Sequence, residues 1–157
     1  MLHAHVHCDC FEKGRITSTP PYQELVYIDE DGALSVRSKS GAAHADVYYW
    51  RENACEHERS IILSHCIGNM ALVATLRMEL ERHPDWFPIL LNKTIHNGIH
   101  AGDFLTVEDV RQVKEELKRL ENYKCVDADT TPYMEAFKGK MSELVECALA
   151  LSKPIVF

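Results

Sequence analysis

Apolar residues are densest between Ile61 and Leu80. They form two neighbouring rows with the three- and four-residue spacing of an α-helix, a pattern typical of a helix buried on most of its circumference. One row consists of Ile62, Cys66, Met70, Val73, Leu76 and Leu80, and the other of Leu63, Ile67, Ala74 and Met78. His83 before Pro84 marks the end, because a residue before proline avoids the helical conformation. The pattern predicts a central buried helix at about residues 60–82.

Apolar and polar side chains alternate from Leu2 to Cys10, and a period of two predicts a strand with one apolar face. Further along, Asp31-Gly32 lies between two short apolar runs, which strongly indicates a hairpin. We therefore expect a first strand near the N-terminus and a hairpin with strands near residues 24–29 and 33–38.

The rest of the chain predicts helices and a final strand. The helices are expected at residues 42–58, at residues 106–123 and from Thr131 to just before Pro154, and the strand at residues 155–157. Thr106 and Asp109 resemble a capping box at the start of the second helix. Residues 89–96 fit either a strand or a turn of helix. This order of elements predicts a single α+β domain over residues 1–157, with a small antiparallel sheet packed against helices.

The chain carries a formal net charge of −7 at pH 7. This charge argues against a nucleic-acid-binding protein, which needs a basic face to neutralise phosphates. It is compatible with a basic protein partner, whose approach it would steer. The alternative is that the charge only keeps the protein in solution.

Two features bear on where the protein resides. His65 and Asn69 interrupt the longest apolar run, so no segment is expected to cross a membrane. Residues 1–10 lack the basic and apolar regions of a signal peptide. We therefore expect a cytoplasmic protein whose six cysteines are reduced thiols. No Cys-X-X-Cys pair is present, so a zinc site of the usual spacing is not expected.

Four polar residues project from one face of the first strand: His3, His5, His7 and Asp9. Alternate residues of a strand lie under about 7 Å apart, so neighbouring histidines can share a metal ion. Imidazole and carboxylate groups suit zinc or another first-row metal, and a metal-dependent hydrolase is the function that such a site indicates. The alternative is a polar strand face without a metal, because a complete site needs a further ligand from elsewhere.

Two other groups are candidates for contacts with a partner protein. The first lies around two glycines, which let a loop approach a ligand closely, and consists of His96, Asn97, His100 and Asp103. The second lies on the helix expected at residues 42–58 and consists of Glu52, Glu56 and His57. The alternatives are a tight connection and a solvated helix face. Cys55 and His57 are not expected to act together, since residues two apart point to different sides of a helix.

Four segments resemble a family of small bacterial proteins: HVHCDCFEKGR, WRENACEHERSIILSHCIGNMALVATLR, NKTIHNGIHAGDFL and ELVECALALSKPIVF. We associate such proteins with the immunity partners of contact-delivered, polymorphic toxins. The resemblance implies a small, acidic, cytosolic protein that neutralises a cognate toxin domain by binding it, and it assigns no catalytic residues. A non-catalytic binding protein is therefore the leading expectation, and a zinc-dependent hydrolase that uses the first-strand histidines is the alternative.

Overall fold

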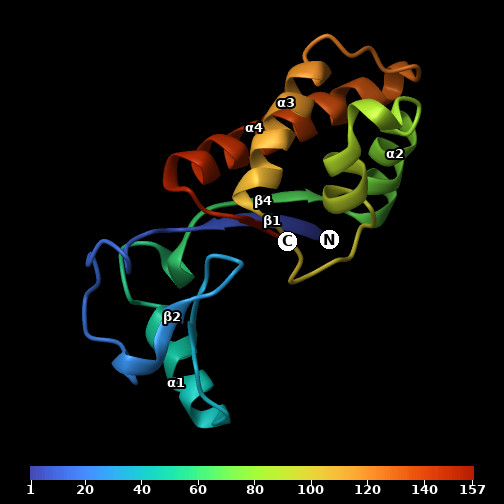
Figure 1. Cartoon of the computed structure of the whole chain (residues 1–157). Coiled ribbons are helices and arrows are strands. Elements are labelled where there is room, and N and C mark those ends of the chain that lie inside the picture. The colour runs from blue at the N-terminus through green and yellow to red at the C-terminus, as the bar shows by residue number, and fades with distance from the viewer.

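A four-stranded antiparallel sheet lies at the centre of the computed structural model, which describes all 157 residues (Figure 1). Its strands are β1 (Leu2–His7), β4 (Ile61–Gly68), β5 (Phe104–Leu105) and β6 (Ile155–Val156). Their spatial order is β4-β1-β6-β5, so strands from the two ends of the chain pair with each other. Both termini therefore lie at the sheet (Figure 1).

Three helices cover one face of this sheet, and together with it they form the large lobe (Figure 1). They are α2 (Met70–Leu80), α3 (Val107–Leu120) and α4 (Thr131–Leu151). The apolar positions of β1, which are Leu2, Ala4 and Val6, point toward the helices and join a cluster of 24 buried residues. This cluster is the main core of the protein. None of the helices has both the length and the apolar character needed to cross a membrane.

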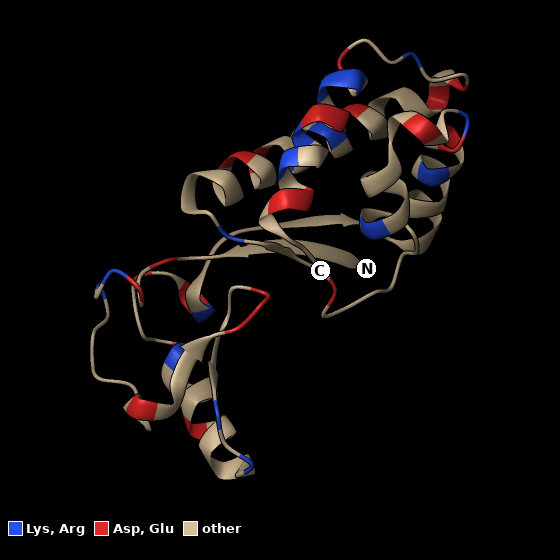
Figure 2. Ribbon diagram, viewed as in Figure 1, with Lys and Arg blue, Asp and Glu red and all other residues tan.

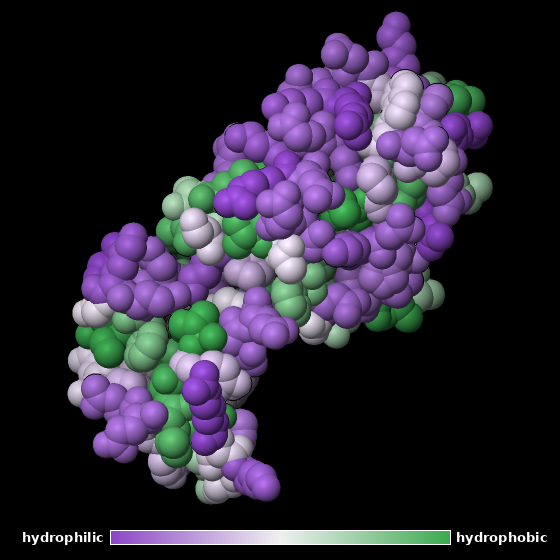
Figure 3. Space-filling view, in the orientation of Figure 1, coloured by the Kyte–Doolittle hydropathy of each residue, from purple (hydrophilic) through white to green (hydrophobic).

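A small lobe lies beyond one end of β1 and β4 (Figure 1). It contains the hairpin of β2 (Val26–Ile28) and β3 (Leu34–Val36), the helix α1 (Gly41–Arg51) and their connections. Its own core is a cluster of three buried residues, which are Leu34, Val36 and Val47, with four partly buried apolar side chains packed against it. The surface is hollowed between the two lobes (Figure 3).

The α+β fold class is confirmed, but the expected helix at residues 60–82 is wrong over its first half. Residues Ile61–Gly68 form β4, and the helix α2 begins only at Met70. Three β-branched isoleucines favour the strand. Asn69 then starts the helix, because its side chain accepts a hydrogen bond from the Leu72 N–H group at 2.9 Å. Met70, expected in the core, is 57% exposed.

The other expected elements are confirmed with small changes of length. The hairpin strands are shorter than expected, and α3 begins with the complete capping box of Thr106 and Asp109. The helix expected at residues 42–58 is wrong beyond Arg51, because residues 52–57 form turns and Glu58–Ser60 a short 3-10 helix, η2. The ambiguous segment 89–96 contains the π-helical turn Leu90–Thr94, η4.

Candidate metal centre

Cys8, Cys10, Cys55 and His57 converge where the two lobes meet. One ligand atom from each residue lies within 4.8 Å of every other. The Sγ atoms of Cys8 and Cys55 are 3.7 Å apart, and His57 Nδ1 lies 3.4 Å from Cys10 Sγ and 3.8 Å from Cys55 Sγ. No disulfide joins these sulfurs, since all six cysteines of the chain are free.

These separations match the edges of a zinc tetrahedron. Zinc binds sulfur at about 2.3 Å and histidine nitrogen at about 2.0–2.1 Å, so the edges of the tetrahedron are roughly 3.8 Å between two sulfurs and roughly 3.6 Å between sulfur and nitrogen. The three distances among Cys8, Cys10, Cys55 and His57 lie within a few tenths of an ångström of these values. Three thiolates and one imidazole form one of the usual ligand sets of structural zinc. The residues present therefore fit a zinc ion.

The first pair of ligands lies just after β1, where the chain leaves the sheet. The Cys8 N–H group donates to the Ser60 carbonyl at 2.8 Å and thereby holds the end of β1 beside the start of β4. The chain then turns, and the Arg15 N–H group donates to the Cys10 carbonyl at 2.8 Å. Asp9, between the two cysteines, binds Lys13 and Arg15 at 2.7 and 2.8 Å. The hydrogen bond from Lys13 is the main reason that the pKa of Asp9 lies below its ordinary value.

The second pair of ligands lies in the connection between α1 and β4. After His57, the chain reverses through Arg59 and Ser60, which both have left-handed backbone conformations with φ of 55° and 58°. Consecutive left-handed residues other than glycine are costly and persist where the surroundings hold them. The two ligand loops are also tied to each other, since the Thr17 N–H group donates to the Ala54 carbonyl at 2.8 Å. The backbone thus brings both pairs of ligands together.

The thiols of this centre are shielded from water. Cys8 is 6% exposed and Cys10 is 2% exposed. Burial raises the pKa of Cys8 to about 12 and raises that of Cys10 as well, so without a metal both remain protonated at neutral pH. A metal ion must displace these protons, and metal affinity will therefore rise with pH. The positive charge of Arg15 acts in the opposite direction on Cys10 and favours its thiolate.

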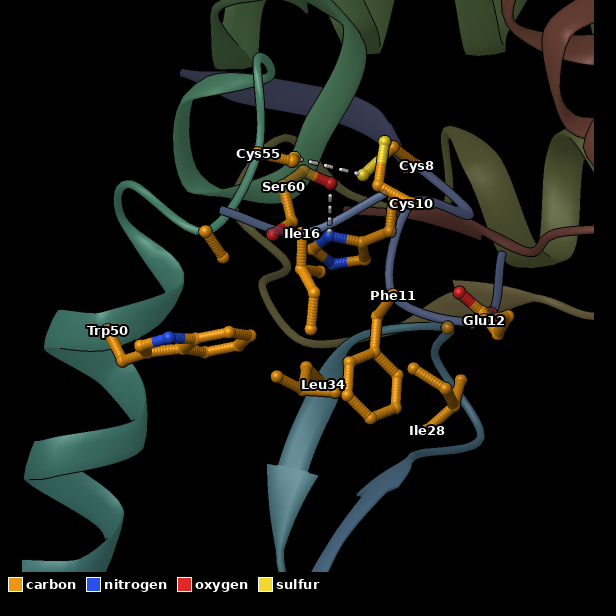
Figure 4. A pocket seen from close by; sticks show the side chains of 13 residues that line it. Cys8, Cys10, Phe11, Glu12, Ile16, Ile28, Leu34, Trp50, Cys55 and Ser60 are labelled. Carbon is orange, nitrogen blue, oxygen red and sulfur yellow. Dashed lines mark hydrogen bonds between the residues drawn. The ribbon is translucent and has the colours of Figure 1, made fainter. Parts of the chain in front are cut away.

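The space beside the centre is too small for a substrate. Cys8, Cys10 and Cys55 lie together at one end of a cavity, with apolar side chains such as Trp50 and Leu34 toward the other (Figure 4). The cavity has a volume of about 10 Å³, barely enough for one water molecule. A zinc ion held by these four protein ligands would have the closed coordination of structural sites.

The Nε2 atom of His57 lies 3.9 Å from a carboxylate oxygen of Glu56, which is too far for a hydrogen bond. A histidine that binds a metal through one nitrogen commonly donates its other N–H group to a carboxylate or carbonyl oxygen. Glu56, which was expected to contact a partner, lies on the side of the ring where such a contact forms.

The four residues expected to bind metal on the first strand do not form one ligand set. His3, His5 and His7 do project from the sheet face that the helices leave uncovered, and the rings of His5 and His7 lie 4.9 Å apart. Asp9 is held in ion pairs with Lys13 and Arg15. Groups of three or more converging ligand atoms occur at two other places in the chain.

The residues expected to contact a partner lie at opposite edges of the sheet. Glu52, Glu56 and His57 precede the edge strand β4, whereas the loop from His96 to Asp103 precedes the other edge strand, β5. Within this loop the structure brings His96, His100 and Asp103 together. The side chain of Asn97 instead accepts a hydrogen bond from the Ile99 N–H group within the turn.

Two features of the sequence conceal the four-residue centre. The ligands are not spaced as Cys-X-X-Cys, because the centre combines the Cys-X-Cys of residues 8–10 with the Cys-X-His of residues 55–57. The pattern of residues 42–58 also predicts a helix, in which Cys55 and His57 would point to different sides, but the helix ends at Arg51. The useful signal was two ligand pairs with a single intervening residue, each beside the expected end of an element.

Comparison with known proteins gives no assignment, because no family model, no characterised protein and no solved structure matches this chain.

Proposed function

We propose that this protein acts by binding a partner protein and that a structural zinc ion at Cys8, Cys10, Cys55 and His57 holds its two lobes together. The tetrahedral spacing of the four ligand atoms supports this proposal most strongly. Two ligands come from the segment after β1, and two come from the segment between α1 and β4. One ion would therefore join the two segments that connect the sheet to the small lobe. Because all four ligands come from the protein, we propose that this ion stabilises the fold and does not take part in catalysis.

The hollow between the lobes is the surface that we propose for the partner. The sheet face that carries His3 and His5 is the one that the helices leave uncovered. The hairpin of the small lobe extends toward the sheet (Figure 1). Burial lowers the pKa of His5, while the charges of Asp31 and Arg51 shift it in opposite directions, which places both charges near this face. The partner would lie between the two edges of the sheet, β4 and β5, next to which the two groups of expected contact residues lie.

Acidic residues lie on both sides of this hollow, at the tip of the hairpin and in the loop before β5 (Figure 2). The hairpin tip contributes Asp29, Glu30 and Asp31, and the loop contributes Asp103. Together with the net charge of −7, they favour a partner with a basic face, whose association they would accelerate. The resemblance to immunity proteins makes a cognate toxin domain the partner that we propose, and six unpaired thiols favour the reducing cytoplasm as its location.

The test is binding of the full-length protein to the purified product of the neighbouring gene, measured at low and high salt. Wild type is compared with Asp31→Asn in the proposed surface and with Glu115→Gln, an exposed carboxylate on α3, as the matched control. We expect association to slow with rising salt and with Asp31→Asn, and to be unchanged by Glu115→Gln. Absence of binding, together with no protection of cells that express the neighbouring gene, would refute the immunity function. Equal effects of the two substitutions would refute the proposed surface.

A further inference from the structure

His100 carries a buried nitrogen lone pair that has no hydrogen-bond partner. Its Nε2 atom lies 2.8 Å from the Thr94 carbonyl oxygen, which can only accept, so the ring proton resides on Nε2. In the neutral ring, Nδ1 is then an acceptor. That atom is buried without a hydrogen-bond partner, in a side chain that is 4% exposed. A buried acceptor without a donor is costly, and a cation bound to this atom would satisfy it.

Two other ligand atoms face the same point. The Oδ2 atom of Asp103 lies 3.3 Å from His100 Nδ1 and 3.7 Å from His96 Nε2. Ligands with metal bonds of about 2.1 Å are roughly 3.0–3.4 Å apart around one ion, and both distances to Asp103 are close to this range. All three ligand atoms lie within 4.8 Å of one another. The bond from His100 Nε2 to a backbone carbonyl is also the usual outer contact of a metal-binding histidine.

The backbone around these ligands is fastened to the sheet edge. The Gly102 N–H group donates to the Phe157 carbonyl at 2.7 Å, and the Phe157 N–H group donates to the Asp103 carbonyl at 2.9 Å. Gly102 has a φ of 83°, a left-handed conformation that favours glycine and lets the loop return to β5. The ring of His100 packs against that of Phe157 at 4.8 Å. The ligands are therefore positioned before any ion binds.

Two members of the cluster lie at an open surface pocket of about 400 Å³, large enough for a small molecule. His96 and Asp103 line it, together with Asn92, Lys93, Gly102 and Phe104. Two neutral imidazoles and one carboxylate leave a divalent ion with net positive charge and open positions. Such an ion attracts an anionic oxygen ligand and polarises it. This arrangement differs from the closed ligand set of the Cys-rich centre.

We propose that His96, His100 and Asp103 form a second metal site, which binds a divalent first-row transition metal and presents open coordination positions to a small oxygen anion in the adjoining cavity. Two histidines and one carboxylate are a common ligand set for such ions. The site is independent of the structural zinc centre. It places metal chemistry at the loop before β5 instead of on the first-strand histidines.

The test is the metal stoichiometry of untagged, full-length protein after loading with Zn²⁺ and removal of free ion. Wild type is expected to hold two equivalents, and Asp103→Asn and His100→Ala one each. His44→Ala, which alters a histidine outside both clusters, should retain two. The second equivalent should bind at least about 10-fold more weakly in Asp103→Asn, since even loss of an outer-shell contact costs 10–100-fold. Asp103 is 59% exposed, so this variant is expected to fold even if His100→Ala does not.

Cobalt(II) separates the two centres in the same proteins. The Cys-rich centre gives thiolate-to-cobalt charge-transfer absorption, which Cys10→Ser should abolish and Asp103→Asn should leave unchanged. Inorganic phosphate should alter the remaining cobalt spectrum of wild type but not that of Asp103→Asn. A wild type that never binds a second equivalent, or an Asp103→Asn variant that binds the second equivalent as tightly as wild type, would overturn the second site. A spectrum indifferent to phosphate would overturn the anion ligand.

Discussion

Removal of metal from Cys8, Cys10, Cys55 and His57 is expected to release the small lobe while the large lobe stays folded. The reason is the unequal distribution of buried apolar side chains. The large lobe has a cluster of 24 buried residues, whereas the small lobe has three of its own. The loops that carry the four ligands are also the connections between the lobes. The perturbation can be made by chelation or by Cys10→Ser.

The magnitudes favour the metal as the main support of the small lobe. Full burial of Leu34, Val36 and Val47 contributes about 1.5–3 kcal/mol each, or roughly 5–9 kcal/mol together. Binding of structural zinc contributes about 10–16 kcal/mol at pH 7 in small zinc-binding peptides.

Hydrogen exchange followed by mass spectrometry measures this directly, because it reports protection segment by segment. After chelation, and in Cys10→Ser, amides of β2, β3 and α1 should lose protection, while those of α3 and α4 keep it. Cys147→Ala, which removes a thiol of α4 outside the cluster, should leave the small lobe protected. Equal protection of α1 with and without metal would refute the reasoning.

Three stability predictions follow from the large lobe and can be checked by denaturant unfolding. Leu76→Ala should lower the free energy of unfolding by about 2–5 kcal/mol, because the Leu76 side chain is fully buried. Met70→Ala should lower it by less than about 0.5 kcal/mol, because Met70 is exposed. Glu116→Gln should lower the free energy of unfolding by about 1–3 kcal/mol, since two backbone N–H groups donate to different carboxylate oxygens at 2.8 and 2.9 Å and the substitution turns one of these acceptors into an NH2 donor. Asp109→Asn should lower the free energy of unfolding by about 1–2 kcal/mol at pH 7, because Asp109 pairs with Lys93 and caps α3. The control Glu108→Gln, which alters an exposed ion pair on the same helix, should change it by close to zero.

The loss in Asp109→Asn should depend on pH. Burial raises the pKa of Asp109, but hydrogen bonds from Lys93 and Thr106 outweigh it, so the net pKa lies below the ordinary value. A carboxyl with a depressed pKa in the folded protein contributes stability above its unfolded pKa of about 3.9 and loses it as the pH falls through the folded value. The difference between wild type and Asp109→Asn should therefore shrink below about pH 4. A difference that stays constant down to pH 2 would contradict this assignment.

The sequence predicted those elements whose side-chain pattern agrees with their local signals. The helix α3 follows from its apolar spacing and from the capping box of Thr106 and Asp109. The run from Ile61 to Leu80 shows the opposite case, because its apolar residues satisfy a helical period while the strand buries both faces in part. Gly68 and Asn69 mark the change from strand to helix. At Gly68 a Cβ atom would lie 2.7 Å from the Cδ2 atom of Leu72, so a larger residue would force the Leu72 side chain to move.

The two clusters differ in how far the sequence reveals them. His96, His100 and Asp103 lie within one short loop, so their grouping could be predicted from the sequence. Cys8 and Cys55 are 47 residues apart, and only the antiparallel pairing of β1 with β4 brings their segments together. Without that pairing, the sequence offers no reason to combine the two ligand pairs. Assigning β4 to a helix therefore concealed the centre.

Zinc K-edge X-ray absorption of untagged protein tests the structural zinc centre most directly. The Asp103→Asn variant is loaded with one equivalent of zinc, so that the signal comes from the Cys-rich centre alone. The account predicts three sulfur ligands at about 2.3 Å and one nitrogen at about 2.0–2.1 Å. A first shell of only nitrogen and oxygen, or a protein that fails to retain one equivalent of zinc, would contradict it.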